Sequence, residues 1–204
     1  MTDKPQNNDL DIVFVIDKSG SMYGSEEDTM GGFNSFIETQ RKKEQNIKVT
    51  TVLFNDGYDM LYERKPINDV DNLTSREYRV DGSTALLDAI GKTVVSLDKV
   101  IDNKVLFVIM TDGLENSSIE YNKSNIKSMI KNHNWEFIFM GADIDSYGEA
   151  SRIGIKRSHV ANYKKSEEGM KDAFYSMDVA TDYLMKNEEL DEKAEWKESL
   201  AKYD

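Results

Sequence analysis

The sequence contains no cysteine, only 2 prolines and only 2 histidines among its 204 residues. Without cysteine there is no disulfide framework and no thiol chemistry. The histidines, His133 and His159, lie near no other plausible metal ligand in the sequence and are expected to be structural. No stretch approaches 18 consecutive apolar residues, so we expect no membrane-spanning helix. The polar start of the chain, residues 1–9, has no apolar signal core.

An excess of positive charge is also missing. The formal net charge is −12, and the isoelectric point is near 4.7. Nucleic-acid binders draw most of their affinity from basic residues on phosphates, and anionic membranes attract basic segments. We therefore expect neither partner. The chain length, with 39% hydrophobic and 31% charged residues, predicts a globular protein with one domain of more than typical size.

Apolar runs alternate with helical patterns along the chain, which is typical of a mostly parallel α/β sheet. Strands are predicted at residues 10–17, 47–55, 58–65, 104–111, 135–142 and 158–162, and helices at 29–45, 84–100, 118–132, 146–153 and 166–186. The first strand is apolar without alternation, which indicates burial on both faces. The turn Asn55-Asp56-Gly57 predicts a tight hairpin, so the strand at 58–65 returns antiparallel at an edge.

The end of the chain differs from the rest in composition. We predict one domain over residues 1–186, followed by a highly charged tail over residues 187–204 that is not a separate domain. Trp196 and Leu200 are the main apolar residues of this tail. Two interpretations stay open for it, a terminal helix that docks on the domain and a frayed end.

Oxygen-bearing side chains gather at three places that lie far apart in the sequence. Asp17, Ser19 and Ser21 alternate in the loop after the first strand. Thr84 opens a helical segment, and Asp112 follows a second apolar strand. An all-oxygen ligand set favours Mg²⁺, Mn²⁺ or Ca²⁺ over zinc or copper. In open α/β sheets, ligand sites form at the carboxyl ends of strands where the strand order reverses.

The pattern Asp-x-Ser-x-Ser, a later Thr and a later Thr-Asp-Gly resembles the metal-ion-dependent adhesion site (MIDAS) of the von Willebrand factor A domain. The resemblance covers roughly residues 9 to 185 and implies a doubly wound, Rossmann-like sheet, mostly parallel with one antiparallel edge strand and helices on both faces. It implies that the strands ending at Asp17 and Asp112 are neighbours. Ser19 and Ser21 would bind the metal directly, and Thr84 directly or through water. Asp17 and Asp112 would hold the metal largely through water molecules.

The resemblance further implies a protein-binding module rather than an enzyme. An Asp or Glu of a partner protein would complete the coordination of the metal, with Mg²⁺ expected and Mn²⁺ or Ca²⁺ as alternatives. The protein is expected to be a cytoplasmic monomer of the stand-alone bacterial or phage type. Two other functions stay open, Mg²⁺-dependent hydrolysis of a phosphate ester and a scaffold with a structural metal. Against hydrolysis, Asp17-Lys18-Ser19 lacks the second acid that haloacid-dehalogenase-type phosphatases use two positions on.

Some residues beside these motifs have two interpretations. Lys18 is expected to be a solvated lysine, although it could weaken cation binding or reach an acidic partner. Asp143 and Asp145 follow a strand at the same edge as the metal. They are expected to form a polar loop with a helix cap at Asp145, although they could hold a second cation. Asn116 and the two serines after it are expected to begin a helix.

Overall fold

The computed structural model describes residues 9–190 and 195–204. Its strands are β1 (Leu10–Asp17), β2 (Ile47–Phe54), β3 (Tyr58–Pro66), β4 (Lys104–Thr111), β5 (Glu136–Ala142) and β6 (Val160–Tyr163). Its α-helices are α1 (Glu26–Lys42), α2 (Leu86–Leu97), α3 (Lys123–Asn132), α4 (Ser146–Arg152) and α5 (Glu167–Met185). Four 3₁₀ segments are η1 (Gly20–Met22), η2 (Ile67–Asp69), η3 (Arg157–His159) and η4 (Glu195–Tyr203). Within these described ranges, no helix is long and apolar enough to cross a bilayer.

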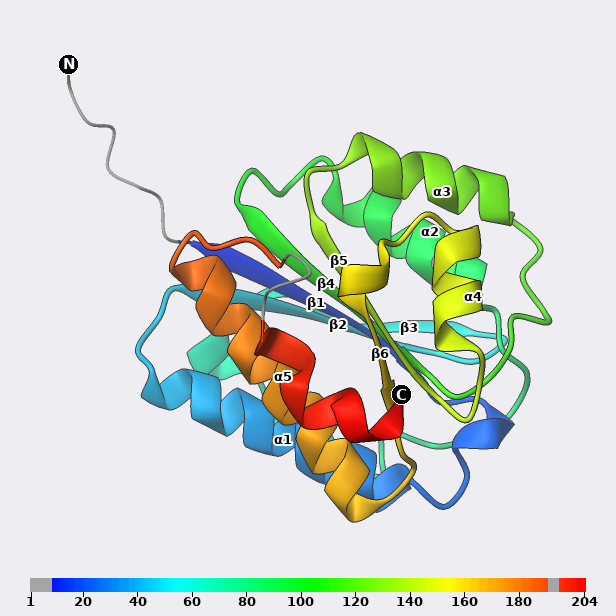
Figure 1. The fold of residues 1–204 in the computed structure, drawn as a ribbon, viewed down its shortest axis with the longest axis horizontal. Helices are drawn as coiled ribbons and strands as arrows, with labels where there is room; N and C mark the ends of the chain where they lie inside the picture. The colour runs from blue at the N-terminus through cyan, green and yellow to red at the C-terminus, as the bar shows by residue number, and fades with distance from the viewer. Residues whose placement is uncertain (1–8, 191–194) are drawn as a thin grey trace.

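The six strands form one sheet in the order β3-β2-β1-β4-β5-β6, with helices on both faces (Figure 1). Neighbouring strands are parallel except for β2 and β3, which are antiparallel. The chain runs outward from β1 to β2 on one side and from β4 to β6 on the other, so the strand order reverses between β1 and β4. The predicted fold class is therefore confirmed, antiparallel edge strand included.

The central position of β1 explains why its sequence is apolar throughout. All eight of its residues are buried. Successive side chains point to opposite faces of the sheet, so Ile12, Phe14 and Ile16 belong to one core and Val13 and Val15 to the other. Helices α1 and α5 cover the first face, and α2, α3 and α4 cover the second (Figure 1). Both faces of β1 are therefore shielded from water.

Helix α3 starts five residues later than the sequence predicts. The prediction began at residue 118, but α3 begins at Lys123. The carboxylate of Asp88 in α2 accepts hydrogen bonds of 2.8–3.0 Å from the backbone N–H groups of residues 119–121. These bonds hold the segment as a loop against α2, and Asn122 then starts the helix with a capping box. A contact between distant residues therefore overrides the local helical pattern.

The C-terminal segment η4 docks on the domain, which is one of the two predicted interpretations of the tail. Trp196 and Leu200 are each 1% exposed and belong to the core beneath α5. Trp196 Nε1 donates to the carbonyl oxygen of Ser158 at 3.1 Å, and Lys197 Nζ donates to that of Val160 at 2.7 Å. The segment therefore covers the outer side of the edge strand β6. Residues 191–194 of the predicted tail lie outside the described residues.

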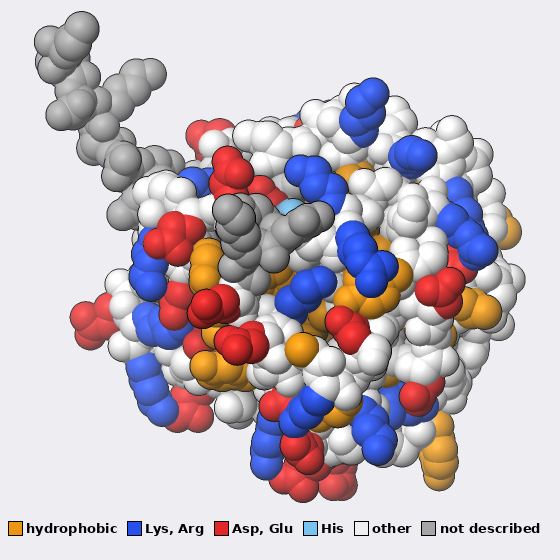
Figure 2. Space-filling view, in the orientation of Figure 1, with side chains coloured by type: hydrophobic (Ala, Val, Ile, Leu, Met, Phe, Trp, Pro, Cys, Tyr) orange, Lys and Arg blue, Asp and Glu red, His pale blue; other side chains and the backbone are white. Residues whose placement is uncertain are grey.

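Charged side chains of both signs are interspersed on the face seen in Figure 2. Some ion pairs connect different elements. Lys43, which follows α1, lies 2.7 Å from a carboxylate oxygen of Asp178 and of Asp182, both in α5. Each such partly exposed pair contributes only about 1 kcal/mol or less to stability. These pairs bridge α1 and α5 but add little to the stability of the fold.

Candidate metal centre

The predicted ligands meet at the carboxyl edge of the sheet, where β1 and β4 lie side by side. Asp17 is the last residue of β1, and Asp112 directly follows β4. Ser19 and Ser21 lie in the turn after β1, and Thr84 lies two residues before α2. The predicted neighbour relation of the two strands is correct. The strand reversal between β1 and β4 leaves space for these loops at one edge.

Three hydroxyl groups form a tight cluster at this edge. Ser19 Oγ lies 3.1 Å from Ser21 Oγ and 3.0 Å from Thr84 Oγ1. Ser21 Oγ donates to Asp112 Oδ1 at 2.5 Å. Oxygens on adjacent corners of a Mg²⁺ octahedron, each about 2.1 Å from the metal, are about 3.0 Å apart. The spacing of the hydroxyl oxygens therefore fits neighbouring positions around such a cation.

Gly113 allows the loop after β4 to approach this cluster closely. A Cβ atom at position 113 would lie 2.6 Å from Thr84 Oγ1, 3.0 Å from Ser21 Oγ and 3.4 Å from Asp17 Oδ2. The first of these distances is shorter than real Cβ contacts, so a side chain here would displace Thr84. Three oxygens from two segments, the end of β1 with its turn and the residue Thr84, thus converge on a space that only a glycine leaves open.

Asp17 lies buried beneath the hydroxyl cluster. Its Oδ1 accepts the backbone N–H of Ser19 at 2.7 Å, and its Oδ2 accepts the hydroxyl of Thr111 at 2.6 Å. Burial raises the pKa of Asp17 to about 6, hydrogen bonds from Thr111 and Ser19 oppose the rise, and the nearby Asp112 carboxylate adds to it. A cation at the hydroxyl cluster would stabilise the ionised form of Asp17. The electrostatics of the buried acid therefore favour a positively charged ligand.

Asp112 lies beside the same cluster, where its Oδ1 accepts the hydroxyl of Ser21 and its Oδ2 is buried. Among the described residues, its Oδ2 accepts no hydrogen bond of good geometry. The ammonium group of Lys165 lies 2.8 Å from it as an ion-pair partner. A buried carboxylate is unfavourable unless positive charge compensates it, so Asp112 is suited to a cationic partner. The residues present therefore fit a hard divalent cation.

Hydroxyl groups are essential to such a site. Within residues 9–190 and 195–204, no three or more His, Cys, Asp or Glu side chains cluster as metal ligands. The predicted set has two carboxylates, Asp17 and Asp112, and its other members are the hydroxyl groups of Ser19, Ser21 and Thr84. The candidate centre thus differs in chemistry from carboxylate-rich or histidine-rich sites.

Asn116 positions Thr84, a role that sequence reasoning missed. Its side-chain oxygen accepts the backbone N–H of Thr84 at 2.9 Å, and its own N–H donates to the Thr84 carbonyl at 3.0 Å. Glu115 accepts the N–H of Leu87 at 3.0 Å in the first turn of α2. The loop after β4 is therefore tied to the start of α2. The sequence pattern assigned Asn116 to a helix start, and nothing in it pairs positions 84 and 116.

The interpretation of Lys18 as a solvated side chain is corrected. Its side chain is only 12% exposed, and its ammonium group lies 2.7 Å from Asp59 in β3. Lys18 therefore points along the sheet edge toward β3 and is neutralised within the chain. Asp145 behaves as the simpler interpretation predicted, because it accepts the N–H of Gly148 at 2.9 Å and caps α4.

Both histidines pair with protein groups away from the candidate centre, as expected of structural residues. His159 Nε2 lies 2.6 Å from Glu136 Oε2. The hydrogen bond to His159 lowers the pKa of Glu136 below its ordinary value, against the effect of burial. His133 Nε2 lies 2.8 Å from Asp98 Oδ1, and its ring packs against Trp135. These contacts link the start of β5 to η3 through His159 and the residues before β5 to the end of α2 through His133.

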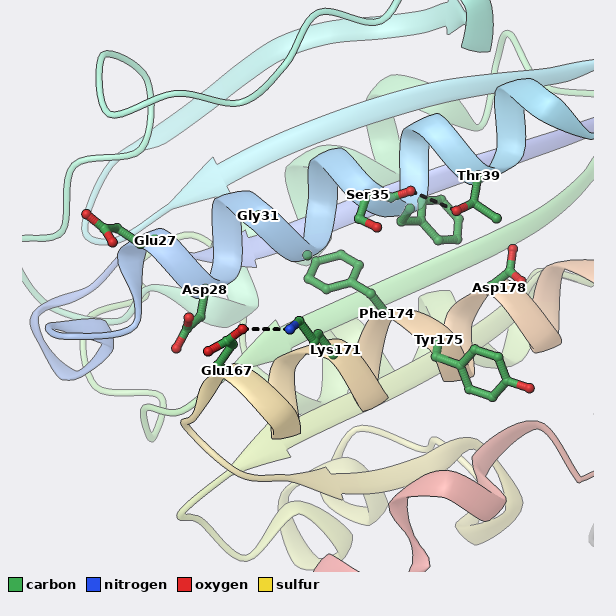
Figure 3. A pocket seen from close by; sticks show the side chains of 12 residues that line it. Glu27, Asp28, Gly31, Ser35, Thr39, Glu167, Lys171, Phe174, Tyr175 and Asp178 are labelled. Carbon is green, nitrogen blue, oxygen red and sulfur yellow. Dashed lines mark hydrogen bonds and ion pairs between the residues drawn. The ribbon is translucent and has the colours of Figure 1, made fainter.

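A groove of about 720 Å³ lies between α1 and α5, and none of the five predicted ligands lines it (Figure 3). The ring of Phe174 reaches into it from α5, and the Glu167–Lys171 ion pair lies at one end. A Cβ atom at Gly32 would lie 2.3 Å from that ring, so the glycine lets α5 pack closely on α1. The groove is thus a feature of helix packing, distinct from the candidate metal centre.

The chain is similar to solved structures at low sequence identity. The pilus adhesin SpaC from Lactobacillus rhamnosus GG, in its open conformation, matches with a TM-score of 0.70 and 14% identity over 87% of this chain and 30% of that one. A von Willebrand factor type A protein from Catenulispora acidiphila matches with a TM-score of 0.59 and 13% identity over 85% of this chain and 42% of that one. The chain has a von Willebrand factor A-like fold.

A third solved structure bears on the metal. Proximal thread matrix protein 1 from the mussel byssus, with a zinc-occupied MIDAS motif, matches with a TM-score of 0.61 and 16% identity over 84% of this chain and 46% of that one. The zinc ion is a property of that protein, which shares the fold of this chain. The chain spans less than half of the length of each of these three proteins. No protein-family model matches the sequence, and no curated protein matches it at a significant level.

Proposed function

We propose that this protein is a divalent-cation-dependent protein-binding module with an intact MIDAS. The hydroxyls of Ser19, Ser21 and Thr84 would hold the cation directly, and Asp17 and Asp112 would hold it largely through water. Mg²⁺ is the expected cation, with Mn²⁺ and Ca²⁺ as alternatives. The observation that carries this proposal is the hydroxyl cluster, with spacings of 3.0 and 3.1 Å, beside a buried carboxylate oxygen of Asp112.

When bound, the cation would supply an electrophilic position that accepts an Asp or Glu carboxylate of a partner protein. The chain itself orients the ligands. Asp17 fixes the turn after β1 through the N–H of Ser19, and Asn116 fixes Thr84 through both of its backbone groups. Thr111 holds the second oxygen of Asp17. The site is thus preorganised for recognition, and no bond of the partner needs to break.

Exposed apolar side chains next to the motifs support a protein partner. Tyr23 follows Ser21 by two positions and is 79% exposed, and Leu114 follows Asp112 by two positions and is 54% exposed. Large apolar and aromatic side chains that are exposed beside polar groups are typical of protein interfaces. We therefore propose that the acidic residue of the partner is flanked by apolar residues that contact Tyr23 and Leu114.

The alternative of phosphate-ester hydrolysis receives less support from the geometry. Asp17 is the acid that would act as nucleophile, but its side chain is buried and both of its oxygens accept hydrogen bonds within the chain. A nucleophilic carboxylate needs an open approach to the phosphorus atom. The similar proteins named above include an adhesin and a matrix protein. The other alternative, a scaffold with a structural metal, is distinguished from the proposed function by the partner-binding experiment.

The first experiment tests the metal. Isothermal titration calorimetry with MgCl₂ is expected to show one site in the wild type and a large loss of affinity in Thr84→Val, which removes one hydroxyl while keeping the side-chain shape. Ser83→Ala is the matched control, because Ser83 is an exposed neighbour outside the cluster. Equal binding by Thr84→Val and the wild type would remove Thr84 from the site and refute the assigned ligand set.

The second experiment tests the partner. Peptides with a central Asp or Glu between apolar residues are compared with Asn and Gln versions, with Mg²⁺ and with EDTA. Binding that requires both Mg²⁺ and the acidic residue supports the metal bridge. A partner protein that the wild type and Thr84→Val capture equally, even in EDTA, would move the interface elsewhere and leave the metal a structural role. The cytoplasmic location and the monomeric state stay predictions.

A further inference from the structure

Lys165 brings a positive charge from a distant part of the chain to the candidate metal centre. It lies in the loop between β6 and α5. Its ammonium group is 2.8 Å from Asp112 Oδ2 and donates a hydrogen bond of 2.6 Å to the backbone carbonyl of Ser21. Both partners belong to the predicted MIDAS segments. Lys165 thus joins two segments of the candidate centre from outside the motif.

The backbone around Lys165 is anchored on both sides. Tyr163, two residues earlier, ends β6 and is 2% exposed. Ser166, the next residue, is the N-cap of α5, and its side chain accepts the N–H of Gly169 at 3.1 Å. The side chain of Lys165 is 25% exposed, whereas its neighbour Lys164 is exposed. The fold therefore directs one of two adjacent lysines into the centre and the other to solvent.

Lys165 pairs with the carboxylate that would also hold the metal, with Lys165 at Oδ2 and the hydroxyl of Ser21 at Oδ1. Asp112 Oδ2 is buried and has no other hydrogen-bond partner of good geometry among the described residues. An ammonium group stabilises such a buried carboxylate when no divalent cation is bound. With a divalent cation at the hydroxyl cluster, two positive charges would lie within a few ångströms of one carboxylate and repel each other. The two cations would therefore compete for Asp112.

We propose that Lys165 is an internal counter-cation that holds Asp112 in the metal-free protein and competes with the divalent cation for it. The inference rests on the proposed metal centre. Binding of the divalent cation displaces the ammonium group from Asp112, so Lys165 weakens the affinity of the site and raises the metal concentration at which it fills. In the absence of metal, Lys165 keeps the segments of Ser21 and Asp112 together.

The test replaces Lys165 with methionine, which keeps the length of the side chain and removes the charge. Lys164→Met is the matched control, because it makes the same change in net charge at an exposed neighbour. Calorimetric titration with MgCl₂ is expected to show binding at least about fivefold tighter in Lys165→Met, the lower end of typical coupling between interacting ligands. Lys164→Met is expected to bind like the wild type.

Thermal melting gives a second readout, in which Lys165→Met is expected to be less stable than the wild type without metal and to gain more stability from Mg²⁺. In EDTA, Lys165→Met is expected to melt below the wild type, because Asp112 Oδ2 loses its ion-pair partner. In excess MgCl₂, the shift in melting temperature relative to EDTA is expected to be larger for Lys165→Met than for the wild type. Near-ultraviolet circular dichroism checks the fold, and Lys165→Gln replaces the methionine variant if that variant fails to fold.

The outcomes separate this inference from the proposed function. Equal or weaker Mg²⁺ binding by Lys165→Met, with a normal wild-type site, overturns the role of Lys165 and leaves the metal centre in place. An equal gain in affinity for Lys164→Met also overturns it, because the effect would then be one of net charge. If neither the wild type nor Lys165→Met binds Mg²⁺, the proposed metal centre fails and the inference fails with it.

Discussion

Gly113→Ala tests the geometry of the candidate centre with a single methyl group. That methyl would lie 2.6 Å from Thr84 Oγ1 and 3.0 Å from Ser21 Oγ. Overpacking of this kind typically destabilises a protein by about 1–3 kcal/mol. The strain is relieved if the Thr84 hydroxyl turns away, but the site then loses a ligand. Either outcome removes the cation site, so we expect Gly113→Ala to fold and to lose Mg²⁺ binding.

The expected shift in melting temperature follows from the free energy with which a bound ligand stabilises the folded state. A ligand at about 100 times its dissociation constant stabilises the folded state by about 2.7 kcal/mol. For a chain of this length, about 1 kcal/mol shifts the melting temperature by about 2–4 °C. Saturating MgCl₂ is therefore expected to raise the wild-type melting temperature by about 5–11 °C. Saturating MgCl₂ is expected to leave the melting temperature of Gly113→Ala unchanged.

Differential scanning fluorimetry with MgCl₂ and with EDTA measures both effects. Gly31→Ala serves as the control, because a Cβ at Gly31 of α1 meets nothing within 4 Å. Alanine is the better helix former by up to about 1 kcal/mol, so this control is expected to melt slightly higher and to keep the full Mg²⁺ shift. A full Mg²⁺ shift in Gly113→Ala would refute the placement of the cation among these oxygens.

Three further predictions concern residues around the centre and in the core. Asn116→Ala is expected to weaken Mg²⁺ binding by about 10–100-fold in calorimetry, because the backbone N–H of Thr84 loses its acceptor. Trp196→Ala is expected to lower the free energy of unfolding in urea by about 3–5 kcal/mol. Glu136→Gln removes an acid whose pKa is lowered in the folded state, mainly by its hydrogen bond to His159. Since the Glu136 side chain is 34% exposed, the loss at pH 6 is expected to be about 1 kcal/mol or less. The difference in stability between the variant and the wild type is expected to shrink as the pH falls below 4.5. It vanishes once the pH is below the lowered pKa of Glu136 in the folded protein, where Glu136 is protonated in both states.

The sequence predicts the sheet well because its central strands carry an unambiguous signal. The run from Ile12 to Ile16 is apolar on both faces, and the structure buries it between two layers of helices. The five proposed ligands stay a prediction, although the structure brings the segments that carry them together at the carboxyl edge of β1 and β4. Helix ends are less predictable, because contacts such as that of Asp88 with residues 119–121 depend on the folded chain.

Sequence patterns do not predict the ion pairs that the lysines near the candidate centre form. Lys18 lies inside the motif, but its ammonium group pairs with Asp59 on the adjacent hairpin. Lys165 lies 53 positions after Asp112 in sequence, outside any motif, yet it contacts Asp112. Periodicity and motif spacing describe neighbours along one element. They carry no information on which of two adjacent lysines, Lys164 or Lys165, a loop turns inward.

The docked C-terminal segment has a consequence for self-association. An uncovered edge strand is a template for pairing with a second chain. At one edge, η4 occupies backbone carbonyls beside and within β6. At the other edge, β3 carries charged side chains, a register shift and a terminal Pro66, all of which discourage strand addition. Removal of residues 187–204 would thus expose a bare strand, and concentration-dependent aggregation, visible in light scattering, is the expected failure of a shortened chain.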